Sequence, residues 1–137
     1  MCGAFVFAAD LLRHVNIDGL TVDCVRASSY GEGMESSGSV VLSGLTTDVV
    51  GRHVLLVEDI VDTGLTLAKL KAKLAEMGAA SVAVVTLLNK QSRRTNDMVP
   101  DYVGFECPDA FVVGYGLDYA GKYRELPFVG VLRPECI

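Results

Sequence analysis

The pattern of apolar and polar positions is clearest in the middle of the chain. Residues 52–60 (RHVLLVEDI) form a continuous apolar run rich in valine and leucine, which is typical of a strand buried on both faces of a parallel sheet. Four apolar residues then recur at helical spacing ahead of a glycine stop: Leu67, Leu70, Leu74 and Met77. Residues 81–90 (SVAVVTLLNK) predict a second buried strand. These segments form a βαβ unit, whose right-handed crossover makes the strands parallel.

The flanking segments predict the remaining elements. A helix is expected over residues 5–15 and a strand over residues 20–27. Three further short strands are expected at residues 102–105, 111–116 and 128–132. No repeat or linker divides the chain, so the fold class is α/β, with one domain over residues 1–137.

Residues 28–40 (SSYGEGMESSGSV) interrupt this pattern with glycine and serine, which cannot pack a core. The segment is therefore a mobile loop. On pattern alone, the plainest interpretation is a hairpin connection.

Composition narrows the class of protein. The 137 residues suit one globular domain, and the net charge of −5 argues against a nucleic-acid partner. The apolar runs are too short to span a bilayer, and the first residues lack the basic start of a signal peptide, so no membrane association is expected. Four cysteines without a CxxC pair indicate reduced thiols and a cytoplasmic protein rather than disulfides or zinc. The two histidines are isolated in sequence, and we expect them to be structural.

The stretch VLLVEDIVDTGLTL, residues 54–67, combines features that suit opposite charges. In open α/β sheets, ligands bind beyond the carboxyl ends of the strands, which is where this stretch turns into its helix. Residues 63–66 offer free backbone N–H groups, a glycine and two hydroxyls to a phosphate. No lysine follows Gly64, so this is not the loop of nucleotide triphosphatases, and no GxGxxG is present. One terminal phosphate fits best.

Three acids precede this turn. Glu58 and Asp59 could accept hydrogen bonds from vicinal sugar hydroxyls or hold Mg²⁺. Asp62 lies where it could take a proton from a reacting group. The alternative is a helix N-cap at Asp62 or Thr63 with solvated acids at the strand end. An N-cap leaves the other two acids unexplained, so the residues favour a phosphorylated sugar, with Mg²⁺.

VLLVEDIVDTGLTL resembles the phosphoribosyl-pyrophosphate signature of the type I phosphoribosyltransferases. The resemblance covers nearly the whole chain, because GAFVFAADLLR, VRASSYGEGMESSG, TLLNKQSRR and FECPDAFVVGYGLDYAGKYRELPFVGVLRPE are similar to the hypoxanthine-guanine branch. It implies a central, mainly parallel sheet flanked by helices. It also implies a Mg²⁺-dependent enzyme of purine salvage, in which N9 of hypoxanthine or guanine displaces pyrophosphate from phosphoribosyl pyrophosphate to give IMP or GMP.

The resemblance assigns the sugar-phosphate residues, with Glu58 and Asp59 on the ribose hydroxyls and Asp62 as the general base near N7 of the purine. The phosphoribosyl site as a whole comprises Glu58, Asp59, Ile60, Val61, Asp62, Thr63, Gly64, Leu65 and Thr66. Pyrophosphate is assigned to Gly3 and Arg124. Residues 28–38, including Ser29 and Tyr30, are similar to the lid over the reacting centre.

The resemblance also assigns the residues that bind the base. Lys90 would donate to the purine O6, which selects 6-oxopurines over adenine. From the residues alone, Lys90 would be a solvated strand-end lysine, and Phe111 a core aromatic. By resemblance, Phe111 stacks on the base, beside Ala110 and the backbone of Val112. Asp118 borders the base and, with Glu58 and Asp59, is expected to hold Mg²⁺.

Two departures from the family accompany the resemblance. Relatives carry further sequence ahead of the position of Met1, and Cys2 stands where many have lysine. Without the preceding sequence, we expect apolar surface to be exposed. The resemblance implies a homodimer or homotetramer. The alternatives are a catalytically impaired fragment and a regulatory protein that senses phosphoribosyl pyrophosphate on the same fold.

Overall fold

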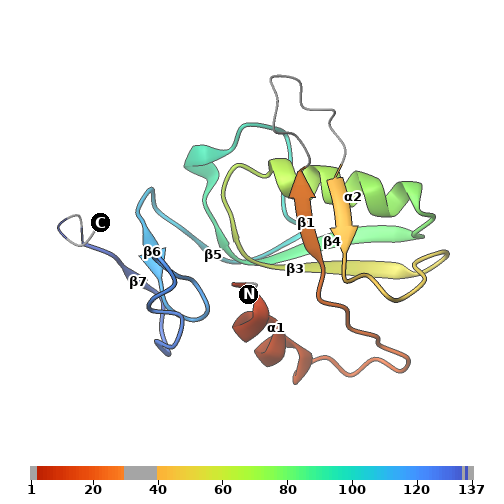
Figure 1. Cartoon of the computed structure of the whole chain (residues 1–137), viewed down its shortest axis with the longest axis horizontal. Helices are drawn as coiled ribbons and strands as arrows, with labels where there is room; N and C mark the ends of the chain where they lie inside the picture. Colours follow the sequence, from red (N-terminus) through yellow and green to blue (C-terminus); the bar gives the residue numbers. More distant parts are fainter. Residues whose placement is uncertain (1–2, 30–39, 134, 136–137) are drawn as a thin grey trace.

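The computed structural model describes residues 3–29, 40–133 and 135, and Figure 1 shows the arrangement of their elements. A parallel sheet lies between two helices, and two small antiparallel pairs accompany it. In chain order the elements are α1 (Phe5–Leu12), β1 (Arg26–Ser29), β2 (Val40–Ser43), β3 (His53–Val61), α2 (Leu65–Glu76), β4 (Ser81–Asn89), the 3₁₀ helix η1 (Gln91–Arg93), β5 (Tyr102–Glu106), β6 (Val112–Val113) and β7 (Gly130–Val131).

The three central strands run parallel in the order β3-β4-β5. The predicted βαβ unit is confirmed, since α2 connects β3 to β4 and the register pairs His53 with Ser81 and Val61 with Asn89. The strand predicted at residues 102–105 is confirmed as β5. All three strands therefore end at the same edge of the sheet, where the polar residues that follow them meet.

The core lies between α2 and one face of the sheet. Leu67, Leu70 and Leu74, three of the four residues that predicted this helix, are buried against Leu56 and Val84. Burial of each leucine side chain contributes about 2 kcal/mol relative to exposure. This packing fixes the first turn of α2 directly after the end of β3.

The expectation that the strand at residues 52–60 is buried on both faces is wrong. Leu55 of β3 points away from α2 and is 46% exposed, and every residue of the edge strand β5 is exposed. The cause is that α1 covers this face of the sheet incompletely. The helix contacts β3, but none of its own side chains is buried there. Exposed apolar surface, as expected from the sequence, is present on this side of the sheet.

The strand predicted at residues 20–27 is also wrong for most of its length. Pairing with β2 begins only at Arg26, and Val22 is exposed. The preceding residues are held by polar contacts instead, since Asp23 accepts hydrogen bonds from the backbone N–H and hydroxyl groups of Thr46. An apolar alternation without a partner strand did not produce a strand here.

Two more boundaries differ from the sequence prediction. The helix expected over residues 5–15 ends at Leu12. The strand expected over residues 111–116 is reduced to β6, because Gly114 and Tyr115 adopt positive φ angles of 92° and 52°. The strand expected over residues 128–132 is likewise reduced to β7, which pairs antiparallel with β6.

The β1–β2 pair supports the hairpin interpretation of the glycine-serine segment, because Ser29 pairs antiparallel with Val40. Residues 30–39, which contain Tyr30 and most of the expected lid, lie outside the described residues. No helix among the described residues is long and apolar enough to cross a membrane.

Candidate active site

The turn after β3 presents backbone N–H groups at the start of α2. Gly64 is the N-cap residue, with a φ angle of 77°, and no side chain caps the helix. The alternative in which Asp62 or Thr63 is the N-cap is therefore wrong. Glycine is favoured by this φ angle, and an added Cβ would also lie in tight contact with Cδ of Arg94, at 3.0 Å. The uncapped first turn can accept an anion.

Glu58 and Asp59 are half-buried near the end of β3, not solvated as the alternative interpretation required. Burial, together with the neighbouring charge of Asp59, raises the pKa of Glu58 to about 7. The pKa of Asp59 is also raised, mainly by burial, although Arg124 opposes the shift. Carboxylates held in this state favour partners that compensate for lost hydration, such as hydroxyl donors or a cation.

Gly3, Asp59 and Arg124 come together from three distant parts of the chain. An added Cβ at Gly3 would overlap Oδ2 of Asp59 and would lie 3.6 Å from Nη1 of Arg124. Arg124 is fixed by Asp118, whose Oδ1 lies 2.7 Å from Nη2, and by the carbonyl of Gly116, 2.5 Å from Nη1. The sequence-predicted sugar and pyrophosphate residues thus share one location.

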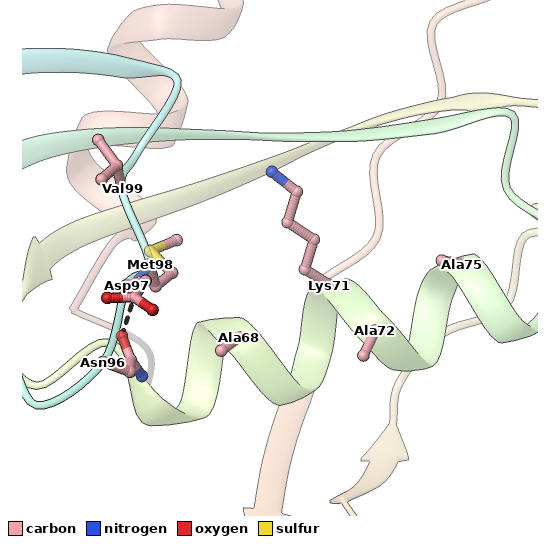
Figure 2. Close-up of a pocket in the computed structure, with 8 residues that line it drawn as sticks. All are labelled: Ala68, Lys71, Ala72, Ala75, Asn96, Asp97, Met98 and Val99. Carbon is pink, nitrogen blue, oxygen red and sulfur yellow. Dashed lines mark hydrogen bonds between the residues drawn. The ribbon is translucent and has the colours of Figure 1, made fainter.

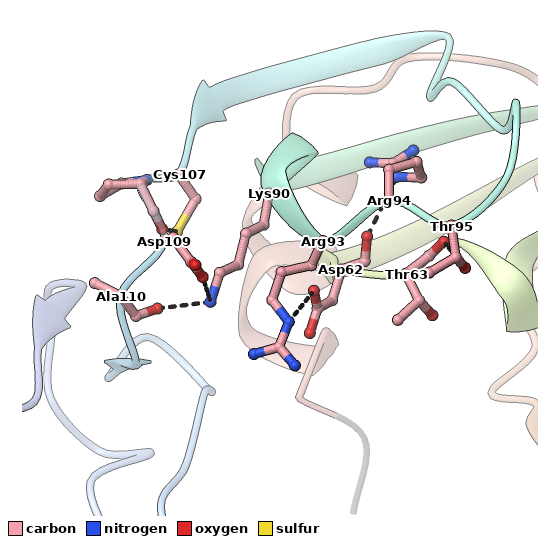
Figure 3. Close-up of polar contacts among 10 residues, drawn as sticks. Asp62, Thr63, Lys90, Arg93, Arg94, Thr95, Cys107, Asp109 and Ala110 are labelled. Atoms are coloured by element: carbon pink, nitrogen blue, oxygen red, sulfur yellow. Dashed lines mark hydrogen bonds and ion pairs between the residues drawn. The ribbon is translucent and has the colours of Figure 1, made fainter.

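Lys90 is buried at the end of β4, with only 7% of its surface exposed. Its Nζ donates to the carbonyl of Ala110 over 3.0 Å and lies 3.1 Å from Oδ1 of Asp109 (Figure 3). The alternative of a solvated strand-end lysine is therefore wrong. Two of the three ammonium donors are engaged by the protein, and one is left for a ligand acceptor.

Phe111 is not a core aromatic, since it is 44% exposed. Its ring meets that of Tyr119 edge-on, with centroids 5.4 Å apart and planes at 85°. The neighbouring Val112 is half-buried in β6. One flat aromatic face is therefore held in place by Tyr119, close in sequence to the carbonyl that Lys90 contacts.

Asp62 is paired with a cation on one side only. Its Oδ1 atom lies 3.7 Å from Nε of Arg93, beyond hydrogen-bond distance, and is buried without a hydrogen-bond partner among the described residues (Figure 3). A buried carboxylate oxygen without a donor is costly unless a ligand supplies one. The Asp62 side chain as a whole is 45% exposed, so the rest of the carboxylate can meet a proton or a hydrogen-bond donor of a substrate.

Comparison with known proteins decides the family. The family described as "Phosphoribosyl transferase domain" matches residues 1–120. The chain belongs to this phosphoribosyltransferase family. It is 51% identical to the hypoxanthine-guanine phosphoribosyltransferase of Bacillus subtilis over 133 residues, which are 96% of this chain and 73% of that protein. It is 50% identical to the hypoxanthine phosphoribosyltransferase of Salmonella typhimurium, over 93% of this chain and 72% of that protein.

Solved structures agree with this family membership. The hypoxanthine phosphoribosyltransferase of Trypanosoma cruzi, in a ternary substrates complex, superposes with a TM-score of 0.90 at 44% identity, over 99% of this chain and 74% of that chain. A hypoxanthine phosphoribosyltransferase from Staphylococcus aureus gives a TM-score of 0.88 at 41% identity, over 98% of this chain and 73% of that chain. The predicted type I phosphoribosyltransferase fold and the resemblance to the hypoxanthine-guanine branch are confirmed.

Besides the phosphate turn, the structure brings together two sets of predicted site residues that are distant in sequence. One contains Gly3, Asp59, Asp118 and Arg124, and the other contains Lys90 and Ala110. Sequence reasoning missed Asp109 and Arg94. Asp109 directly precedes Ala110, but nothing in its spacing relates it to Lys90, nineteen residues upstream and just after β4.

Magnesium is implied by the family, and the described residues fit it in part. Among residues 3–29, 40–133 and 135, no three acidic, histidine or cysteine side chains gather into a metal site. Asp118 is engaged by Arg124, so the expected set of three acids is not assembled. Glu58 and Asp59 do fit, because Mg²⁺ in phosphate enzymes commonly takes one or two carboxylates and completes its shell with water and substrate oxygens.

A second hollow lies outside this site. It is an open groove of about 610 Å³ along the outer face of α2 (Figure 2), lined by Ala68, Lys71, Ala72, Ala75, Asn96, Asp97, Met98 and Val99. None of its lining residues is among the predicted site residues. The predicted site residues lie instead at the edge of the sheet where the strands end.

Proposed function

We propose that the chain transfers the phosphoribosyl group of phosphoribosyl pyrophosphate to N9 of hypoxanthine or guanine, giving IMP or GMP and pyrophosphate. The observation that carries this function is the buried Lys90 ammonium, which keeps one free donor at the sheet edge that also holds the phosphate turn. The reaction belongs to purine salvage. We place it in the cytoplasm, in a homodimer or homotetramer.

The sugar and its phosphate would occupy the end of β3. The uncapped first turn of α2 supports a role in binding the 5′-phosphate, with hydroxyl donors from Thr63 and Thr66. Glu58 and Asp59 would accept hydrogen bonds from the ribose hydroxyls, which replaces the hydration that burial removes.

Purine selectivity would come from Lys90. The third donor of its ammonium suits the O6 acceptor of hypoxanthine or guanine. Adenine places an amino donor at this position, so the ammonium and the amino group would face each other without an acceptor. Phe111 would stack on the base, with Ala110 and the backbone of Val112 along its edge.

Charge separation in the transition state would match the two sides of the site. As the bond from C1 to pyrophosphate breaks, positive charge develops on the sugar and negative charge on the leaving group. The carboxylates of Glu58 and Asp59 would face the sugar, while Arg124 and the backbone at Gly3 would face pyrophosphate. Bound Mg²⁺ would neutralise pyrophosphate charge, with Glu58, Asp59 and Asp118 as its candidate contacts. Asp62 would act as the general base and accept the proton that leaves N7 as N9 bonds to C1.

The direct test incubates the chain with Mg²⁺, phosphoribosyl pyrophosphate and each of four purines, and measures the nucleotide formed. We expect product from hypoxanthine and guanine, and none from adenine. The reaction with xanthine shows whether the site also accepts an oxygen at C2 of the purine. Nucleotide from adenine alone would overturn the role of Lys90. Binding of phosphoribosyl pyrophosphate without product from any purine would replace the enzyme by a sensor on the same fold.

A further inference from the structure

Arg94 lies behind the phosphate turn and ties three segments together. Its Nε donates to the carbonyl of Asp62 over 3.2 Å, as Figure 3 shows. Its Nη2 donates to Oδ1 of Asn89 over 2.5 Å, and its Nη1 donates to the carbonyl of Met98. The donors of a guanidinium are spread over three nitrogens, so it can span three acceptors that lie apart, whereas the three donors of an ammonium are on one atom and need acceptors that converge on it.

The acceptors of Arg94 are neutral. No carboxylate among the described residues lies within ion-pair distance of its guanidinium, although the side chain is half-buried. The nearest acid in this chain of contacts is Glu106 of β5, which accepts from Nδ2 of Asn89 over 3.1 and 3.2 Å. Asn89 thus presents its oxygen to Arg94 because its amide nitrogen is held by Glu106.

These contacts fix the carbonyl side of the phosphate turn. The carbonyl of Asp62 is held by Arg94, and the carbonyl of Thr63 accepts from the backbone N–H of Thr95 over 3.3 Å. Gly64 packs closely against the side chain of Arg94, because an added Cβ would lie only 3.0 Å from its Cδ atom. With the carbonyls held on one side, the N–H groups of the turn are left to face the opposite side.

We propose that Arg94 is a positioning residue for the phosphate turn and for Asp62. It contacts backbone and amide groups rather than substrate, and it transmits the position of the β4 and β5 ends, through Asn89 and Glu106, to the residues that bind the 5′-phosphate. The catalytic consequence rests on the proposed function, but the structural consequence does not.

Arg94→Lys keeps the charge and loses the three-way contact, so it tests this role with little risk to folding. Arg52→Lys is the matched control, because Arg52 also holds a backbone carbonyl, that of Gly19, but at the opposite end of β3. Site-resolved amide hydrogen exchange is measured at two backbone N–H groups. That of Thr95 donates to the carbonyl of Thr63 in the turn, and that of the core residue Val84 donates to the carboxylate of Asp101.

In Arg94→Lys we expect the Thr95 amide to exchange about tenfold faster, with Val84 unchanged. We also expect KM for phosphoribosyl pyrophosphate to rise about tenfold, with KM for the base changed less than about twofold. Arg52→Lys should show neither effect. Unchanged Thr95 exchange, or equal acceleration of Thr95 and Val84, would overturn the positioning role. A wild-type chain that forms no nucleotide would refute the proposed function, and the exchange data would still decide the role of Arg94.

Discussion

The ammonium of Lys90 donates to the backbone carbonyl of Ala110 over 3.0 Å, which joins the end of β4 to the segment before β6. The ammonium also lies 3.1 Å from Oδ1 of Asp109, with which it forms an ion pair. Because both contacts come from one short segment, they direct the remaining donor of the ammonium away from that segment. Under the proposed function this donor meets the purine O6.

Lys90→Gln should therefore lower kcat/KM for hypoxanthine and guanine about a hundredfold, because the buried donor to O6 is shortened and uncharged. Steady-state kinetics with each base measure the loss. Lys71→Gln is the control. Lys71 lies on α2, outside the site, and it is ion-paired with Asp101. Equal kinetics for Lys90→Gln and the wild type would remove Lys90 from base recognition.

Gly3→Ala tests the contact between the start of the chain and β3. The added methyl group would overlap Oδ2 of Asp59, so the carboxylate must move away from its place beside Arg124. We expect KM for phosphoribosyl pyrophosphate to rise about tenfold, because a displacement of about 1 Å in a positioned group has effects of this order or larger.

The control for this substitution is Gly130→Ala in β7, where an added Cβ would meet the ring of Phe128 at 3.5 Å, an ordinary contact. Circular dichroism on both variants checks that they fold. A normal KM in a folded Gly3→Ala protein would mean that Asp59 has room to relocate without cost.

Sequence patterns predicted the elements whose periodicity is enforced by burial. Leu67, Leu70 and Leu74 face the core and so repeat at helical spacing, and the parallel strands on either side follow from the crossover. The strand predicted at residues 20–27 was wrong because this segment is held by side-chain hydrogen bonds, such as the one from Thr46 to Asp23, and not by pairing with a neighbouring strand. Local pattern carries no information about whether a partner is present.

The site was predictable where its residues are neighbours in sequence, as from Glu58 to Thr66. Arg94 and Asp109 were missed because their roles depend on which loops meet at the sheet edge. Arg94 lies thirty-two positions from Asp62, and Asp109 contacts Lys90 from the β5–β6 connection, with the whole of β5 between the two residues in sequence. Such pairings arise from topology, so no motif in a single sequence signals them.

Glu58 should make stability depend on pH. Its pKa is raised from 4.5 to about 7 in the fold, chiefly by burial. Its contribution is thus fully present below pH 4.5, where both folded and unfolded forms are protonated, and is lost as pH rises to about 7, where the folded carboxyl must ionise. Glu58→Gln removes this loss, so the variant should gain about 3 kcal/mol over the wild type at pH 8 and almost nothing at pH 4.5.

Urea unfolding of the two proteins at both pH values measures this difference. Asp18→Asn supplies a matched loss of one exposed carboxylate, and it should show no such pH-dependent gain. Equal stability of Glu58→Gln and the wild type at pH 8 would show that the carboxylate of Glu58 is well hydrated in the fold.

Asp62→Asn tests the proposed general base. The substitution keeps the size of the side chain and one acceptor oxygen, but the amide cannot accept the proton that leaves N7. We expect kcat to fall about a hundredfold, with KM values within about threefold of the wild type, because the lost interaction is made chiefly in the transition state.

Asp97→Asn in the α2 groove carries the same change of charge outside the site and should keep normal turnover. The distinction from electrostatic binding lies in the pH dependence of kcat. If Asp62 is the base, the acidic limb of the profile should disappear in Asp62→Asn. If kcat is unchanged, or falls with the acidic limb preserved, proton transfer must be assigned to another group, and Asp62 would then serve to balance the charge of Arg93.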